Sequence, residues 1–103
     1  MPAATGTAET KRDRNGNLKV KVEVKHLAQP AALTPPKQAY VVWTQIRGQD
    51  PQNQGQLKVN DNLEGSFSTT VPSPTFEIFI TAEDNPTAAA PTGPRLLKGS
   101  MQP

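Results

Sequence analysis

Few side chains in this sequence have the types and the spacing that catalysis requires. His26 is the only histidine among the 103 residues. A Ser-His-Asp arrangement would need an activated hydroxyl beside it, and the sequence has no G-x-S-x-G or comparable nucleophile motif. Glu83 and Asp84 are adjacent, so in a strand they would point to opposite faces, whereas a glycosidase needs two carboxylates that flank one cleft. We therefore predict a partly exposed structural His26, no catalytic residue, and a protein that is not an enzyme.

The sequence also lacks the ligand pattern of a metal site. Asp50 is followed by Gly55 and Asp61 at a spacing that faintly resembles a calcium loop, in which a glycine allows a sharp turn and a last carboxylate closes the site. Glutamines replace the expected acidic ligands, so we interpret this segment as a polar turn. The absence of cysteine excludes thiol catalysis and Cys-ligated zinc or copper. We expect no metal ion and no other cofactor.

Two features could bind a ligand without doing chemistry. Lys19, Lys21 and Lys25 form a row that could face an anionic surface, but such a row is more often the solvated face of a strand, where it deters edge-to-edge pairing. Trp43 could stack on a sugar, but a lone Trp in the strand YVVWT usually packs in the core of a sandwich. The formal net charge of +2 is too small to predict nucleic-acid binding.

Strands with a period of two must position these residues. Residues 18–25, LKVKVEVK, alternate strictly between apolar and charged side chains, which predicts a strand with one buried face. The Asn-Gly pair at 15–16 is a strong hairpin signal, so we expect residues 6–13 to form the partner strand. A two-residue loop would place Asp13 beside Leu18, which is a poor core match. A longer loop or a bulge is an equally good alternative.

The rest of the sequence indicates short strands separated by breaks rich in proline and glycine. Three prolines within 28–37 bar a regular helix, so we predict an ordered crossing between two sheets. Residues 39–48 predict a strand that is apolar on both sides for part of its length, and 48–56 a turn. The remaining expected elements are a hairpin-like pair at 56–61 and 63–71 with its turn near Asp61-Asn62, and strands at 76–84 and 95–101.

About seven short strands, with no segment of 3.6-residue periodicity, predict an all-β fold. The expected architecture is an immunoglobulin-like antiparallel β-sandwich. We assign residues 6–101 to this single domain and residues 1–5 to a disordered or expression-derived N-terminus. The sequence has no apolar stretch of about 18 residues, so no membrane span is predicted.

Four motifs in the second half of the sequence occur in a familiar order: AYVVWTQ, NQGQLKVNDN, FEIFITAED and PTGPRLL. Together they resemble the C-terminal extracytoplasmic domain of the anti-sigma-K factor family, with its Y-x-V-W strand, Gly-led strand, V-T-x-E strand end and P-T-G-P-x-L-L close. The resemblance covers residues 39–99. The matching positions, which we expect to be structural, are Tyr40, Val42, Trp43, Gly55, Thr81, Glu83, Pro91, Thr92, Gly93, Pro94, Leu96 and Leu97.

The resemblance implies a location as well as a fold. Members of that family carry a cytoplasmic sigma-binding segment and one transmembrane helix before this domain, and this sequence contains neither. It therefore implies a β-sandwich outside the cytoplasm, periplasmic or secreted, and not sigma-factor inhibition. Residues 1–10 lack the basic and apolar regions of a signal peptide. The chain is then either cytoplasmic as written or a piece whose export signal was removed.

We therefore hypothesise a non-enzymatic sensor or protein-interaction module that binds a protein partner and no nucleic acid. A carbohydrate-binding or adhesive secreted module is the alternative, by analogy of fold.

The stretch TAEDNPTAAAPTGPRLL, residues 81–97, carries much of the resemblance. It predicts a strand end, an Asx-turn that starts at Asp84, and a connection stiffened by proline. We expect Gly93 to adopt a positive φ that lets the chain turn toward Leu96 and Leu97. The PTGP motif is accordingly interpreted as architectural, because it would return the last strand to the core.

Overall fold

β2 (Leu18–Lys25) is the central strand of a three-stranded antiparallel sheet, and its alternating sequence explains why. In the computed structural model, which describes residues 4–72, 76–93 and 95–101, the last four by their backbone alone, the apolar side chains of β2 are buried and its charged ones are exposed. β1 (Thr5–Arg12) and β5 (Gly65–Val71) flank it in the order β1-β2-β5. The predicted strand with one buried face is confirmed.

The second sheet has four strands in the order β4-β3-β6-β7. Its central strands, β3 (Ala39–Gln45) and β6 (Phe76–Glu83), are buried over nearly their whole length, because one face packs on the other sheet and the opposite face lies under a loop. β4 (Gln52–Leu57) and β7 (Arg95–Met101) form the two edges. The predicted two-sided strand in 39–48 and the predicted strand at 95–101 are both confirmed.

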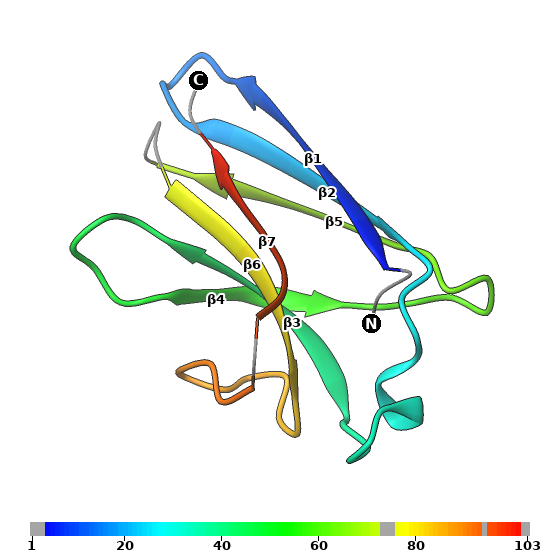
Figure 1. Cartoon of the computed structure of the whole chain (residues 1–103). Helices are drawn as coiled ribbons and strands as arrows, with labels where there is room; N and C mark the ends of the chain where they lie inside the picture. Colours follow the sequence, from blue (N-terminus) through cyan, green and yellow to red (C-terminus); the bar gives the residue numbers. More distant parts are fainter. Residues whose placement is uncertain (1–3, 73–75, 94, 102–103) are drawn as a thin grey trace.

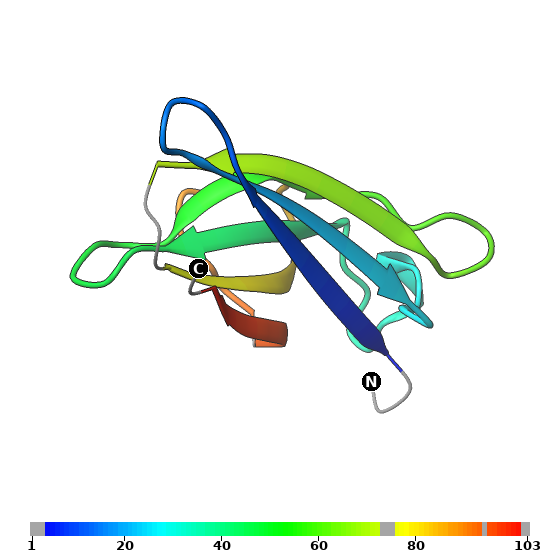
Figure 2. The same cartoon turned by 90° about the horizontal axis from the view of Figure 1, so that it is seen from above.

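The two sheets stack with their strands roughly aligned and enclose one core (Figures 1 and 2). Three connections cross between the sheets, namely β2–β3, β4–β5 and β5–β6. Seven strands in two antiparallel sheets make an immunoglobulin-like β-sandwich, as predicted. In the described part of the chain, no helix is long and apolar enough to cross a membrane. The buried core consists of Leu18, Val20, Val22, Val24, Leu27, Tyr40, Val42, Leu57, Val71, Phe76, Ile78, Ile80 and Ala82.

Two predictions for the middle of the chain are wrong. The segment 48–56, predicted as a turn from its amide-rich composition, contains most of β4, which pairs with β3. The predicted turn near Asp61 exists and is closed by a hydrogen bond from the Asn60 N–H to the Glu64 carbonyl, 2.8 Å. It does not make a hairpin, however, because β4 and β5 belong to different sheets. Composition marks a reversal of the chain without specifying the sheet to which the chain returns.

The first hairpin takes the longer of the two loops that the sequence allowed. Arg12 lies opposite Leu18, so residues 13–17 form the loop. The Asp13 N–H donates to the Asn17 carbonyl at 2.9 Å, and Asp13 Oδ1 accepts the N–H groups of Asn15 and Asn17 at 2.9 and 3.0 Å. Asp13 therefore closes the loop by an Asx arrangement and does not occupy a core position.

The crossing from β2 to β3 is ordered, as predicted, and contains a short 3-10 helix, η1 (Pro30–Ala32). Gln29 Nε2 donates to the carbonyls of Val59 and Asn60 at 2.9 and 2.8 Å. These bonds fix the crossing to the chain that leaves β4.

The first strand begins one residue before residue 6, the predicted start of the domain. Thr5 is the first residue of β1, and Ala4 packs against the core. Residues 1–3, the rest of the predicted N-terminal tail, lie outside the described residues.

Candidate functional site

The side chains that could do chemistry do not converge on one place. His26 is exposed and follows β2 with a φ of 58°. Asp50 and Asp61 are exposed on separate turns, and Gly55 lies between them within β4. The calcium-loop spacing therefore spans a strand and cannot wrap one ion. Among the described residues, no three His, Asp or Glu side chains gather as potential metal ligands.

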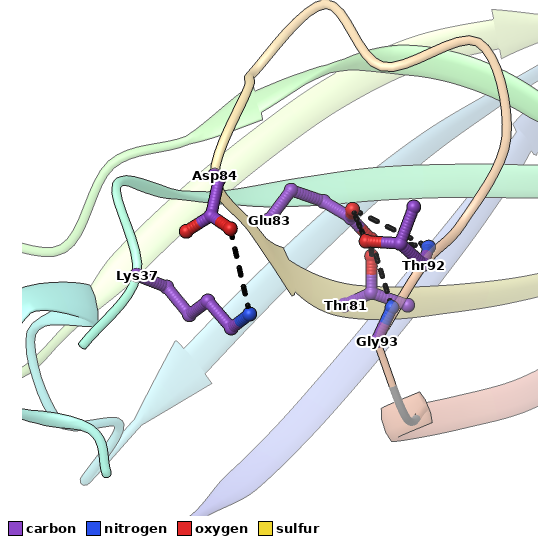
Figure 3. Close-up of polar contacts among 6 residues, drawn as sticks. All are labelled: Lys37, Thr81, Glu83, Asp84, Thr92 and Gly93. Carbon is purple, nitrogen blue, oxygen red and sulfur yellow. Dashed lines mark hydrogen bonds and ion pairs between the residues drawn. The ribbon is translucent and has the colours of Figure 1, made fainter. Parts of the chain in front are cut away.

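The main polar cluster is built around Glu83, the last residue of β6 (Figure 3). Glu83 is 1% exposed. Thr81, on the same face of β6, donates its hydroxyl to Glu83 Oε2 at 2.5 Å. From the far side, Thr92 donates its hydroxyl to Oε1 at 2.5 Å and its N–H to Oε2 at 3.1 Å, and the Gly93 N–H reaches Oε2 at 3.4 Å. One carboxylate thus connects the strand to the loop 84–93.

The environment of Glu83 keeps its carboxylate ionised. Burial acts to raise the pKa of this carboxyl, but the hydrogen bonds from Thr81, Thr92 and Gly93 outweigh it and hold the pKa below its ordinary value. A carboxylate that is shielded from solvent and already accepts several hydrogen bonds is poorly suited to exchange protons with a substrate. Glu83 is therefore suited to anchor a segment of chain.

Trp43 extends this cluster onto the outer face of the four-stranded sheet. Its Nε1–H donates to Thr81 Oγ1 at 2.8 Å, and its ring stacks on Phe79 with centroids 6.4 Å apart and planes inclined by 14°. With Val41 these two rings form a second, smaller apolar cluster. The prediction that Trp43 packs in the core is confirmed, although its core cluster is not the one between the two sheets. Trp43 is fully buried, but it points away from Tyr40 on the same strand and is covered by the loop 84–93.

Asn53 on β4 attaches the middle of that loop. Its Nδ2 donates to the carbonyls of Pro86 and Ala88, both at 3.0 Å, and Ala88 packs against the Trp43 cluster. The loop is therefore bound at its middle by an amide and at its end by a carboxylate.

The turn that opens the loop differs by one residue from the prediction. Asn85 Oδ1 accepts the N–H and the hydroxyl of Thr87 at 2.9 and 2.8 Å, so Asn85, and not Asp84, forms the Asx-turn. Asp84 is exposed and lies 3.7 Å from Lys37 Nζ (Figure 3). Asp84 thus has a weak surface ion pair where a turn-forming role was predicted.

Gly93 is required for space and not for its backbone angle. Its φ lies outside the left-handed region, so the predicted positive φ is wrong. A Cβ on Gly93 would lie 2.8 Å from the carbonyl oxygen of Ala82. The absence of a side chain allows the loop to approach the backbone of β6 closely enough for the N–H groups of Thr92 and Gly93 to reach Glu83.

Arg95, the first residue of β7, closes the other end of the outer cluster. Its guanidinium carbon lies 3.9 Å from the ring centroid of Phe79. Its nitrogens also donate to Glu77 Oε2 at 3.2 Å and to Gln45 Oε1 at 3.3 Å. The apolar outer face is thereby covered by the loop at one end and by a cation at the other.

A β-bulge in β4 explains how neighbouring amide side chains of this edge strand make hydrogen bonds on both faces of its sheet. Asn53 lies opposite Trp43 and Gly55 opposite Val42, so Gln54 is the extra residue. Gly55 has a φ of 137°, and a Cβ there would lie 3.0 Å from the ring of Phe67. A glycine inside a strand is the sequence signal that could have revealed the bulge.

The bulge also turns Gln54 inward, where it bridges the two sheets. Its Nε2 donates to Thr44 Oγ1 at 2.7 Å, and its Oε1 accepts the hydroxyl of Thr69 at 2.8 Å. Sequence reasoning missed both Asn53 and Gln54, because the segment 48–56 was interpreted as a turn.

An open polar groove runs between β4 and the loop 84–93. Its walls consist of amide side chains from the strand and small residues from the loop. Apart from Asp50 at one end, the lining is uncharged. The central lining residues are Gln52, Asn53, Gln56, Pro86, Thr87 and Ala88.

The remaining motif positions lie in or against the core. Tyr40 is buried and donates its hydroxyl to the Ala28 carbonyl at 2.6 Å, and burial raises its pKa to about 12. Val42 belongs to the core between the sheets, and Leu96 and Leu97 pack on that core while half-buried. Pro91 is half-buried, and Pro94 lies outside the described residues.

No protein-family model, curated protein or solved structure matches this chain.

Proposed function

We propose that this protein is a non-enzymatic protein-interaction module of the extracytoplasmic space, and that it binds its partner in the groove between β4 and the loop 84–93. The observation that carries the proposal is the role of Glu83. This buried carboxylate fixes a loop in place, so it organises a surface and is not available for catalysis. Loops that a rigid scaffold positions commonly carry binding functions.

The resemblance to the periplasmic domain of anti-sigma factors supports the same proposal. Trp43, Thr81, Glu83, Thr92 and Gly93 come from three separate motifs of that resemblance, and they meet in one chain of hydrogen bonds. A shared architecture, with a loop fixed over the outer face of a sheet, would explain why these residue types occur together at these spacings. A sensor role would then follow by likeness to that family.

The chemistry of the groove favours a polypeptide ligand. Amide side chains both donate and accept hydrogen bonds, and β4 is an edge strand, with no strand of its sheet on its outer side. An extended segment of a partner could add to such an edge through main-chain hydrogen bonds. Gln52 and Thr87, which are exposed on opposite walls, would then contact its side chains.

The test is partner capture with a matched surface control. The immobilised protein is exposed to an extracytoplasmic extract, the captured protein is identified and purified, and its Kd is measured. We expect the double variant Gln52→Lys with Thr87→Lys to weaken binding at least tenfold. The control, Thr7→Lys with Ser66→Lys on the exposed face of the other sheet, should leave the Kd unchanged. Equal affinity of the two double variants for the captured partner would contradict the proposal, and so would a hydrolytic activity that one substitution abolishes.

The location has a separate test in the coding sequence upstream of Met1. A signal peptide there, or a transmembrane helix after a basic cytoplasmic segment, would support an extracytoplasmic module. Fusion to a cytoplasmic enzyme domain would contradict it.

Nothing observed favours the alternative of a carbohydrate-binding module. Such a module usually needs an exposed aromatic ring on which a sugar can stack. Trp43, Tyr40, Phe76 and Phe79 are buried, and Phe67 is half-buried under the bulge of β4. The five aromatic residues of the sequence therefore leave no open stacking platform.

A further inference from the structure

The first hairpin brings two lysines side by side on the exposed face of the three-stranded sheet. Lys11 of β1 lies directly opposite Lys19 of β2, and Thr70 of β5 lies on the other side of Lys19. All three side chains are exposed and share one face, because directly opposite residues in antiparallel strands point the same way. Like charges in this arrangement destabilise a sheet, so the pair has a cost that folding alone does not explain.

The positive charge at this end of the sheet is not neutralised locally. The ion pairs found among the described residues use Lys21, Lys37 and Arg95 as their cations, and none includes Lys11 or Lys19. Arg12 and Arg14 add two further exposed cations at the same hairpin end. The carboxylates that face this region are those of Glu9 and Asp13. Glu9 lies opposite Lys21 in the pairing of β1 with β2, and Asp13 Oδ1 already accepts two N–H groups of the hairpin loop.

The opposite end of the same sheet carries charges of both signs. The turn before β5 exposes Asp61 and Glu64, and it joins β5 at Gly65, which lies opposite Val24 near the far end of β2. The hairpin end and this turn lie at opposite ends of the sheet (Figure 1). Because the exposed Lys25 and Lys58 lie near Glu64 at the turn end, the excess of positive charge on this sheet is concentrated at the hairpin end.

The surface between these lysines is a shallow groove with hydroxyl groups on one side. Its lining includes Glu9, Lys11, Lys19, Lys21, Ser68 and Thr70. Lys19 and Lys21 are two residues apart on one strand, so their stems are separated by about 7 Å. Ammonium and hydroxyl donors at such a spacing suit successive phosphate groups, which offer several acceptor oxygens and a full negative charge.

We propose that this cationic face, centred on Lys11, Lys19 and Thr70, binds a linear polyanion that carries phosphate groups. The outward-pointing side chains of the face are charged or hydroxyl-bearing, with no apolar anchor among them. A protein partner of ordinary affinity would need such an anchor at the centre of the interface, whereas a polyanion does not. This site is separate from the β4 groove, which lies on the other sheet, and does not depend on the function proposed above.

The test measures binding of fluorescently labelled medium-chain inorganic polyphosphate by anisotropy at several salt concentrations. We expect Lys11→Ser with Lys19→Ser to weaken binding at least tenfold and to flatten the dependence of log Kd on log salt by about one unit per lysine removed. Lys11→Arg with Lys19→Arg should retain binding. The charge-matched control, Lys37→Ser with Arg47→Ser in the connections before and after β3, should change the affinity less than threefold.

Three further ligands distinguish the source of the phosphate groups and the chemical class of the polyanion. The first is a poly(glycerol phosphate) chain of equal charge. If it binds more tightly than polyphosphate, the site is assigned to phosphodiester polymers of the cell surface; if it binds more weakly, the site is assigned to polyphosphate. Either result supports a phosphate site. Equal binding of dextran sulfate, tighter binding of single-stranded DNA, or equal losses in the two charge-removing variants would overturn the proposal. Circular dichroism confirms that each variant is folded.

Discussion

At the scale of single residues, Glu83 has the strongest predicted effect on stability. Its carboxylate accepts hydrogen bonds from a strand on one side and from a loop on the other. An amide in its place has one acceptor oxygen and would point an N–H₂ group at other donors. We expect Glu83→Gln to lower the free energy of unfolding by about 3 kcal/mol, measured by urea denaturation. Glu77→Gln, an exposed change on the same strand, should cost less than about 1 kcal/mol; similar losses would contradict the anchoring role.

The same carboxylate predicts an acid-sensitive stability. Because the pKa of Glu83 is lower in the folded protein than its ordinary value of 4.5, the unfolded chain binds a proton first as pH falls. The stabilisation by Glu83 is therefore complete above pH 4.5 and is lost below it. Urea midpoints from pH 7 to pH 3 should converge for the wild type and Glu83→Gln in that window. A constant difference between the two proteins would show that the carboxyl does not titrate as described.

Tyr40 predicts a matching effect at alkaline pH. Burial raises the pKa of this phenol to about 12 in the folded protein, against about 10 in the unfolded chain. Its contribution to stability is therefore complete below pH 10 and is lost as pH rises toward 12. Because Tyr40 is the only tyrosine, absorbance at 295 nm reports its ionisation alone. We expect the ionisation to coincide with alkaline unfolding; a reversible titration near pH 10 with the fold intact would contradict it.

At the scale of elements, the loop 84–93 is the segment most sensitive to a small change. A Cβ on Gly93 would meet the Ala82 carbonyl at 2.8 Å, so Gly93→Ala should displace the N–H groups that bind Glu83. We expect faster amide hydrogen exchange in residues 85–92 and a loss of about 2 kcal/mol. Gly6→Ala is the matched control, because the nearest atom to its Cβ would be the movable end of Leu97 at 3.4 Å, and its other neighbours would lie at 3.7 Å. Unchanged exchange in the loop would contradict a close approach at Gly93.

The elements that could be predicted from the sequence are the strands whose own side chains show the alternation or the composition typical of a strand. The alternation of β2 and the β-branched and aromatic content of β3 give strands directly. β4 could not be found in this way, because its residues, Gln52–Leu57, are mostly amides, and pairing with β3 decides its conformation. The site was less predictable still. The resemblance marked Thr81, Glu83 and Thr92, but sequence does not show that a hydroxyl, a carboxylate and a loop N–H meet across nine residues.

At the scale of the whole molecule, the two sheets present different surfaces. The outer face of the four-stranded sheet is apolar and is covered by its own loop and by Arg95, whereas the outer face of the three-stranded sheet is charged and open. A sequence with strict alternation in β2 predicts the open face. The covered face could be predicted only in part, because a strand that is apolar on both sides does not show whether a second sheet or a loop buries it.

The position of the two chromophores on β3 gives this molecule two independent reporters. Tyr40 faces the core between the sheets, and Trp43, the only tryptophan, lies under the loop on the opposite face. Indole fluorescence should therefore report detachment of the loop, and phenol absorbance should report separation of the sheets. If the loop is a separate cooperative unit, the tryptophan signal will change at a lower urea concentration than the tyrosine signal. Coincident transitions would instead define the loop and the sandwich as one cooperative unit.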